Sequence, residues 1–232
     1  MLNSNVKKNF ALVTSGKLSA KENMLIDKEL YDSFISSSLP IFRVYEWTES
    51  FTYGVSQNID TIKNLNHIKS YNENYEQRMT GGGILFHGND ISYSLIIPTS
   101  LVKNLSVKES YELICGFLME FYKSLGLKPI YAKDLESIEL SKSQYCQDGY
   151  EPYDILIDGK KVGGNAQRRS KDIIFQHGSI SIDNSTFSIG NSLKDLGIKI
   201  SFEEAKELLI KSFKKIFNVV YEQKNQDILD AS

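Results

Sequence analysis

The sequence predicts a single α+β domain built on a mixed β-sheet. Segments with helical periodicity and segments rich in β-forming residues alternate along the 232 residues, without the regular strand–helix–strand rhythm of parallel α/β folds. The composition is that of an ordinary globular protein, with 41% hydrophobic and 24% charged residues. No repeat or low-complexity tract divides the chain, so we expect one domain over residues 1–232.

The first half of the chain is expected to begin with a helix followed by strands. Residues 21–35 carry apolar side chains near helical spacing, and Ser19 before them is a suitable N-cap. Ile41–Trp47 is rich in β-forming residues and is typical of a strand, as is the shorter stretch 50–54. The further elements expected here are a weak helix over 59–69 and strands over 83–86 and 91–97, joined as a hairpin by the turn residues 87–90.

The second half contains the strongest helical pattern, in which six apolar side chains form one face and Gly126 provides a natural stop. A polar stretch over 135–151 has no clear periodicity, and loops of this length in compact domains tend to be functional or disordered. The elements expected in this half are a helix over 107–125, strands over 153–157, 161–169 and 173–182, and an amphipathic helix over 202–217.

Charge and cysteine content exclude several classes of protein. Lys and Arg number 27 against 29 Asp and Glu, so no overall field draws nucleic acid or an anionic membrane. Residues 1–10 have no continuous apolar core of a signal peptide, and no apolar run approaches the roughly 20 residues of a membrane span. Cys115 and Cys146 cannot form a disulfide framework, and no Cys/His spacing predicts a metal site. We therefore expect a cytoplasmic protein without a bound metal.

The most informative segment runs from Arg78 to His87 and contains Thr80 followed by Gly81, Gly82 and Gly83. Three glycines leave the backbone bare, so that a ligand can approach main-chain N–H groups closely. A basic residue stands before them and an imidazole after them. The segment therefore suits an anionic or strongly polar group, or else forms a glycine-rich hairpin loop.

Two later segments share this polar and small-residue character. In the first, Lys161 precedes Gly163, Gly164 and Ala166, in a position where a strand normally carries bulk. Glycine inside a strand often marks the close approach of a ligand, although a surface lysine at a hairpin tip is the plainer interpretation. In the second, a Gln-His-Gly-Ser sequence that includes His177 interrupts an otherwise apolar strand.

These three segments, in this order, resemble the biotin/lipoate protein ligase catalytic-domain family, and more closely its lipoate branch. The family patterns are a basic-x-Ser/Thr-Gly-Gly-Gly-x-x-aromatic-His segment, a Gly-x-Lys-Val-x-Gly-x-Ala-Gln segment and a Gln-His-Gly-Ser-Ile strand. Further similarity lies upstream, in Asn23-Met24 with Asp27 and Leu30, in Arg43-x-Tyr45-x-Trp47, and in Tyr53-Gly54-x-x-Gln57-Asn58. The resemblance covers about residues 19–219, and implies a largely antiparallel mixed sheet flanked by helices.

The chain departs from the family pattern at two positions. Gln77 stands where the family often has the first of two arginines, and Glu49 stands where a proline commonly follows the tryptophan. Gln77 puts in doubt a phosphate contact at that edge of the site.

The resemblance implies an acyltransferase of protein lipoylation. Cys146 lies seven residues before Tyr153, a placement similar to the nucleophile of M-type octanoyltransferases, and Lys161 matches the family's lysine. Cys146 and Lys161 are therefore the expected catalytic residues, whereas Cys115 on the long helix is expected in the core. An incidental loop thiol is the alternative for Cys146. The expected substrate-binding residues are Arg78, Thr80, Gly81, Gly82, Gly83, His87, Gly163, Gly164, Ala166 and His177.

For this transferase the resemblance implies octanoyl-acyl carrier protein as donor and a lipoyl domain or a glycine-cleavage H-type carrier protein as acceptor. No cofactor, nucleic acid or membrane is expected as a partner. One alternative is an ATP-dependent lipoate–protein ligase lacking its accessory domain, which would use ATP and Mg²⁺. Another is a non-catalytic protein that binds lipoyl domains, and a biotin ligase fits the motifs less well. Residues 181–232 are mostly taken by one helix, so we expect no C-terminal accessory domain.

Overall fold

The centre of the fold is a six-stranded mixed sheet with the strand order β10-β11-β6-β2-β1-β12. The structure is a computed structural model that describes residues 2, 5–65, 68, 71, 73–135, 145, 149–183 and 191–223. From β10 to β2 neighbouring strands are antiparallel, while β1 is parallel to both β2 and β12. The strands are β1 (Lys8–Leu18), β2 (Ile41–Trp47), β6 (Asp90–Pro98), β10 (Gly163–Arg169), β11 (Ile173–Ser181) and β12 (Val219–Gln223). The expected mixed, largely antiparallel sheet is confirmed.

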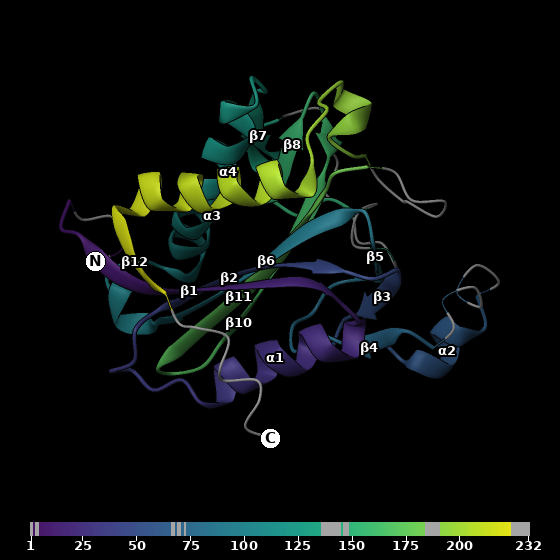
Figure 1. The fold of residues 1–232 in the computed structure, drawn as a ribbon, viewed down its shortest axis with the longest axis horizontal. Helices are drawn as coiled ribbons and strands as arrows, with labels where there is room; N and C mark the ends of the chain where they lie inside the picture. Colours follow the sequence, from purple (N-terminus) through teal and green to yellow (C-terminus); the bar gives the residue numbers. More distant parts are fainter. Residues whose placement is uncertain are drawn as a thin grey trace.

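Two small three-stranded sheets accompany the large one. The first has the order β4-β3-β5 and the second the order β7-β8-β9. Their strands are β3 (Ser50–Tyr53), β4 (Tyr75–Gln77), β5 (Leu85–His87), β7 (Pro129–Tyr131), β8 (Ile155–Ile157) and β9 (Lys160–Lys161). Figure 1 shows β7 and β8 near α4 at the top of the view, and β3, β4 and β5 at its right.

Helices cover both faces of the large sheet (Figure 1). The helix α1 lies along one face, and α3 and α4 lie along the other. The helices are α1 (Ala20–Asp32), α2 (Ile59–Lys63), α3 (Val107–Ser124) and α4 (Phe202–Phe217), with short 3₁₀ turns at Thr99–Val102, Ala132–Asp134 and Lys194–Leu196. Among the described residues, none of the helices combines the length and apolar character needed to span a bilayer.

Local sequence sets where the three long helices start. Ser19, Ser106 and Ser201 are N-caps, and each forms a capping box with the glutamate three residues later. Such caps bond backbone N–H groups that otherwise lack a partner in the first turn. The predicted cap at Ser19 and the helix over 202–217 are confirmed. Gly126, with a φ of +79°, follows the end of α3 as predicted.

The main hydrophobic core lies between the sheet and the pair α3 and α4. Its centre is aromatic: Phe42 of β2 stacks on Phe213 of α4 with 4.1 Å between ring centroids, and Phe117 of α3 packs edge-on against both rings. All three are fully buried. The opposite face of the sheet carries a smaller apolar cluster and most of the polar groups described below.

The predicted hairpin over 83–97 is wrong. The strand β5 pairs with β3 in a small sheet, whereas β6 pairs with β2 and β11 in the large one. The change of sheet occurs at Gly88, whose φ is +126° and whose N–H donates to the Asp90 carboxylate at 3.0 Å. The hydrogen bond from the Gly88 N–H to the Asp90 side chain thus accompanies a change of direction into the large sheet. In a hairpin the chain would instead have run back along β5.

The structure differs from the sequence-based expectations at four other places. The strand expected over 161–169 is divided at Val162, so that β9 and β10 belong to different sheets. The weak helix ends at Lys63, and residues 8–18, for which the sequence predicts no element, form the long strand β1. The strand over 153–157 starts at Ile155, and it turns at Asp158 and Gly159, both with positive φ, as expected.

Truncating the central ring tests the aromatic core. We expect Phe213→Ala to lower the free energy of unfolding by about 3–5 kcal/mol, because it removes a fully buried ring and leaves a cavity. Urea denaturation followed by circular dichroism measures this loss. The matched control is Ile216→Ala on the same helix, whose side chain is 39% exposed and should cost much less. Equal losses for the two variants would contradict the proposed position of the core.

Candidate functional site

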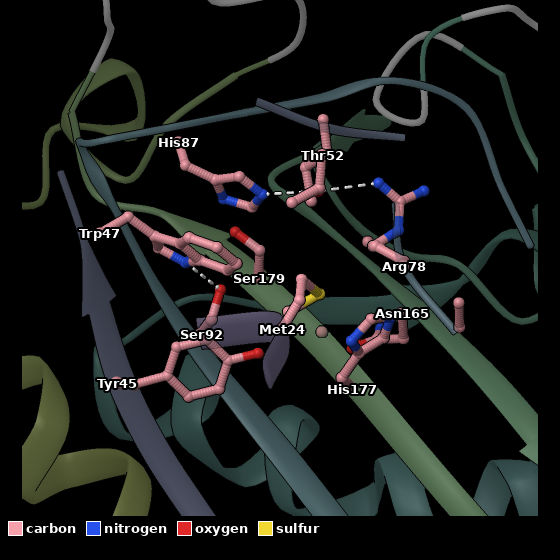
Figure 2. Close-up of a pocket in the computed structure, with 14 residues that line it drawn as sticks. Met24, Tyr45, Trp47, Thr52, Arg78, His87, Ser92, Asn165, His177 and Ser179 are labelled. Atoms are coloured by element: carbon pink, nitrogen blue, oxygen red, sulfur yellow. Dashed lines mark hydrogen bonds between the residues drawn. The ribbon is translucent and has the colours of Figure 1, made fainter. Parts of the chain in front are cut away.

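A pocket opens on the α1 side of the large sheet, and Arg78 and Leu85, on either side of the glycine segment 81–83 in the chain, are among its lining residues. It encloses about 340 Å³ of empty space, part of which is open to solvent. Figure 2 shows side chains from several elements converging on it. The lining residues are Met24, Tyr45, Trp47, Thr52, Arg78, Leu85, His87, Ser92, Gly164, Asn165, Ala166, His177, Gly178 and Ser179. Arg78, His87, Gly164, Ala166 and His177 were expected from the sequence, and the structure brings these five together.

A buried ion pair forms the base of this region. Asp27 of α1 and Arg43 of β2 lie 2.8 Å apart, and their side chains are almost fully buried. Arg43 also donates to the backbone oxygen and side-chain oxygen of Asn23, and to Ser15. Burial opposes ionisation of Asp27, but the Arg43 charge and hydrogen bonds outweigh it and lower the pKa of the carboxyl. The pair is therefore charged in the folded protein.

His177 connects this ion pair to the glycine segment. Its Nε2 lies 2.6 Å from the Thr80 hydroxyl, and its Nδ1 lies 3.9 Å from Asp27. Burial lowers the pKa of His177, against the opposing effect of the nearby Asp27. A neutral imidazole thus anchors Thr80, the residue that directly precedes the three glycines.

His87 is held on three sides. Its Nδ1 is 2.8 Å from the Asp90 carboxylate and its Nε2 is 2.8 Å from the Thr52 hydroxyl. Its ring stacks on Trp47 with 3.8 Å between centroids and 15° between planes. Asp90 accepts further hydrogen bonds from Ser92 and Ser179. Figure 2 shows Thr52 between His87 and Arg78, with Trp47 beside the imidazole.

Arg78 points inward, toward the turn that it precedes. Its guanidinium donates to Thr52 at 2.9 Å, to the Gly83 carbonyl at 2.6 Å and to the Gly81 carbonyl at 3.4 Å. Gly82 has a φ of +101°, and a Cβ on Gly54 would overlap the Gly82 carbonyl oxygen. Glycine is therefore needed at positions 54 and 82 for this turn to form, and Arg78 holds the turn through its carbonyl groups.

The small residues of β10 have different roles. A Cβ on Gly163 would overlap the Ser179 carbonyl oxygen of the neighbouring strand, so packing alone requires glycine there. Gly164 and Ala166 border the pocket, as expected.

Gly178 of β11 lies between Asn165 of β10 and Tyr93 of β6 in register. Because Gly178 has no side chain, the Tyr93 hydroxyl reaches across it to donate to the Asn165 side-chain oxygen at 2.8 Å. A Cβ at position 178 would collide with both partners. One side-chain hydrogen bond thus links β6 to β10 across the intervening strand β11.

Lys161 lies outside the pocket lining. Its ammonium is buried, 2.7 Å from the Asp154 carboxylate and 3.1 Å from the Gly149 carbonyl oxygen. Cys146 falls outside the described residues. Cys115 is buried on α3, as expected, and burial raises the pKa of its thiol to about 12, which keeps it protonated and unreactive.

Several polar residues that position the site were not predicted from the sequence. Thr52 and Asp90 bond His87, Ser92 and Ser179 bond Asp90, and Asp154 bonds Lys161. The only signal in the sequence was a polar residue inside an apolar run at Ser92 and an acid three residues after His87. Among the described residues, no three or more His, Cys, Asp or Glu side chains are grouped to hold a metal ion.

Comparison with known proteins identifies similar sequences over most of the chain. The sequence model of the lipoyl protein ligase A/B catalytic domain matches residues 19–196. A Bacillus subtilis relative named octanoyltransferase LipM is 31% identical over 76% of this chain and 66% of its own length, just under two thirds. A Macrococcus caseolyticus relative of the same name is 32% identical, over 82% of this chain and 70% of its own.

Solved structures show the same fold at lower sequence identity. A lipoate-protein ligase A bound with ATP superposes with a TM-score of 0.71 at 17% identity, covering 97% of this chain and 92% of its own. A bipartite lipoate protein ligase from Thermoplasma acidophilum, described with its E2 lipoyl domain, gives a TM-score of 0.69 at 16% identity, covering 97% and 90%.

The buried neutral His177 predicts a loss of stability in mild acid. Its pKa lies below the ordinary 6.5 in the folded protein, so below about pH 6.5 the unfolded chain binds more protons than the folded one. The free energy of unfolding should therefore fall as the pH drops from 7.5 to 5, by up to about 1.4 kcal/mol per pH unit from this group. His177→Gln, which keeps a partner for Thr80, should show a shallower decline in urea midpoints. An unchanged decline would argue against a neutral His177.

Proposed function

The chain belongs to the lipoyl protein ligase A/B catalytic-domain family, and we propose that it is an octanoyltransferase of protein lipoylation. In this proposal an octanoyl group passes from a donor thioester to Cys146, and then to the lysine of a lipoyl carrier domain. The octanoyltransferase relatives support it, since the similarity covers most of this chain. The shared ligase fold is compatible with it.

Contacts of the described residues on either side of Cys146 support its assignment as the nucleophile. Tyr145, the residue before it, forms an isolated parallel bridge with Ile84, which directly follows the three glycines. On the other side in the chain, the Gly149 carbonyl oxygen accepts a hydrogen bond from Lys161. The two flanks of Cys146 thus contact the glycine segment and the lysine that the sequence singled out.

The chemistry requires a thiolate and a nearby positive charge. The Cys146 thiolate attacks the donor carbonyl, a carbon–sulfur bond to Cys146 forms, the donor carbon–sulfur bond breaks, and the donor leaves as a thiolate. The carrier amine then attacks the new thioester, an amide forms, and the Cys146 sulfur leaves. A buried ammonium favours the thiolate and the oxyanion of both steps. We assign that charge to Lys161, which Asp154 holds in place.

The acyl chain would occupy the apolar part of the pocket. Met24, Trp47, Leu85 and Ala166 offer apolar surface there. Burying an eight-carbon chain against such surface contributes roughly 0.8 kcal/mol per methylene. His177 and Thr80 act indirectly in this proposal, by fixing the position of that segment.

The proposed partners follow from the reaction. The donor would be octanoyl-acyl carrier protein, and the acceptor a lipoyl domain or a glycine-cleavage H-type carrier protein, in the cytoplasm. The reaction needs no nucleotide, because the energy of the donor thioester is kept in the enzyme thioester.

Loss of the nucleophile is the first test. Incubation with octanoyl-acyl carrier protein should add one octanoyl group to the protein, as measured by intact mass, and Cys146→Ala should abolish both the adduct and transfer to a lipoyl domain. Cys115→Ala is the matched control and should keep both, because that thiol is buried and protonated.

Other outcomes would assign the protein differently. Normal transfer by Cys146→Ala rules out the thioester route. Modification that depends on lipoate, ATP and Mg²⁺ identifies a ligase, and carrier binding without transfer from any donor identifies a non-catalytic protein.

The second test removes the buried charge. Lys161→Met alone would leave the Asp154 carboxylate buried without a counter-charge, so it is combined with Asp154→Asn. We expect thioester formation to slow by about 100-fold or more, since a preorganised charge at a developing oxyanion contributes at this scale. Lys160→Met, at the exposed neighbouring position, should change the rate less than about twofold. Comparable rates for the two variants would remove Lys161 from the mechanism.

A further inference from the structure

An ordered row of hydrogen bonds crosses one wall of the pocket. It runs from the Asp90 carboxylate through the His87 imidazole and the Thr52 hydroxyl to the Arg78 guanidinium, with successive distances of 2.8, 2.8 and 2.9 Å. Figure 2 shows its last two links. The row begins at an anion and ends at a cation, and two neutral groups lie between them.

The charged groups at the two ends of the row, Arg78 and Asp90, determine which partner is the donor in each of its hydrogen bonds. A guanidinium only donates, so Thr52 accepts from Arg78 and gives its own hydrogen to His87 Nε2. An ionised carboxylate only accepts, so His87 Nδ1 carries a hydrogen toward Asp90. His87 is therefore held as the neutral tautomer with its Nε2 lone pair facing the Thr52 hydroxyl.

The imidazole cannot turn away from this arrangement. Trp47 stacks on one face of the ring, and Asp90 is itself held by Ser92, Ser179 and the Gly88 N–H. Such an outer shell of contacts is typical of a side chain whose exact orientation matters. Thr52 retains one free lone pair on its oxygen, and Thr52, Arg78 and His87 all line the pocket.

The proposed reaction leaves one proton without an acceptor. A lysine of a carrier domain is an ammonium at neutral pH, with an ordinary pKa of about 10.4, and only its neutral amine attacks a thioester. Cys146 and Lys161 serve the acyl group, so the amine needs another base. Resting on the octanoyl transfer proposed above, we propose that His87 is this base, with Thr52 relaying the proton and Asp90 as the positioning residue.

The transfer balances atom by atom. The carrier ammonium binds the free lone pair of Thr52 and gives it a proton, while Thr52 passes its own hydrogen to His87 Nε2. The neutral amine forms the carbon–nitrogen bond, the carbon–sulfur bond breaks, and the departing thiolate takes the second proton from nitrogen. His87 ends as an imidazolium beside Asp90 and later releases its proton to water.

The surrounding charges favour this direction. Arg78 lies beside Thr52 and disfavours an ammonium there, whereas Asp90 stabilises the imidazolium that forms. Two other titratable groups lie near the row: His177, whose pKa is lowered chiefly by burial, and Tyr45, which interacts with Asp90. Burial raises the pKa of Tyr45 well above its ordinary value, so it stays neutral.

Separating the two half-reactions tests the proposal. The octanoyl-enzyme is first formed from octanoyl-acyl carrier protein and isolated, and a lipoyl domain is then added in a single turnover. We expect His87→Gln to slow this second step by about 100-fold or more, in the range typical of general-base catalysis. Hydroxylamine, a nucleophile that is already neutral at pH 7, should deacylate the variant and the wild type at similar rates. Raising the pH should also recover transfer by the variant, because more of the lysine is then neutral.

Variants at the two other positions complete the test. Thr52→Val, which has no hydroxyl, should slow the lysine step alone, and Thr52→Ser should restore it. Asp90→Asn should move the acid limb of the pH profile of that step to lower pH, because the imidazolium then lacks its counter-charge. Equal rates of lysine transfer for His87→Gln and wild type, or an equal loss with hydroxylamine, would overturn the role of His87. Failure of the wild type to form any octanoyl-enzyme would instead overturn the proposed function.

Discussion

The buried ion pair between Asp27 and Arg43 is the interaction on which the rest of the structure depends. Two charges removed from water are tolerated only when they neutralise each other and their remaining hydrogen-bonding groups are satisfied. Here the partners that satisfy them come from β1, α1, β2, β6 and β11. One pair therefore fixes the position of α1 against four strands. Through His177 it also holds Thr80, the residue that precedes the glycine segment.

One face of the large sheet carries the main hydrophobic core, and the other carries the polar groups of the candidate site. Aromatic rings stack on the side of α3 and α4, where a single cluster buries Phe42, Phe117 and Phe213. On the side of α1 the sheet presents ionic and hydroxyl groups, each held by another polar group. The hydrophobic side supplies the rigidity that keeps those polar distances short. A buried polar network of this kind holds its geometry only on a support that does not move.

The sequence predicts the parts of this fold whose causes are local. The helix over 202–217 and the cap at Ser19 follow from periodicity and from one serine, and both are confirmed. The strand β1 escapes prediction because much of its pairing comes from β12, a strand about 200 residues away in the chain. The position of Asp90 depends on a change of sheet at Gly88, which no local pattern signals. The glycines at 81–83 were expected to bind substrate, but they are not among the residues that line the pocket. Their contacts with Arg78 and Gly54 depend on the tertiary structure, which no local pattern reveals.

The bond from Tyr93 to Asn165 across Gly178 has a consequence for how the sheet opens. The strand β10 forms one edge of the large sheet, and edge strands ordinarily fray first and offer free N–H and C=O groups to other chains. Here β10 cannot separate from β11 without also breaking a bond to β6, two strands away. Loosening of this edge is thereby coupled to the interior of the sheet. The strand that borders the pocket is therefore expected to open together with the interior of the sheet.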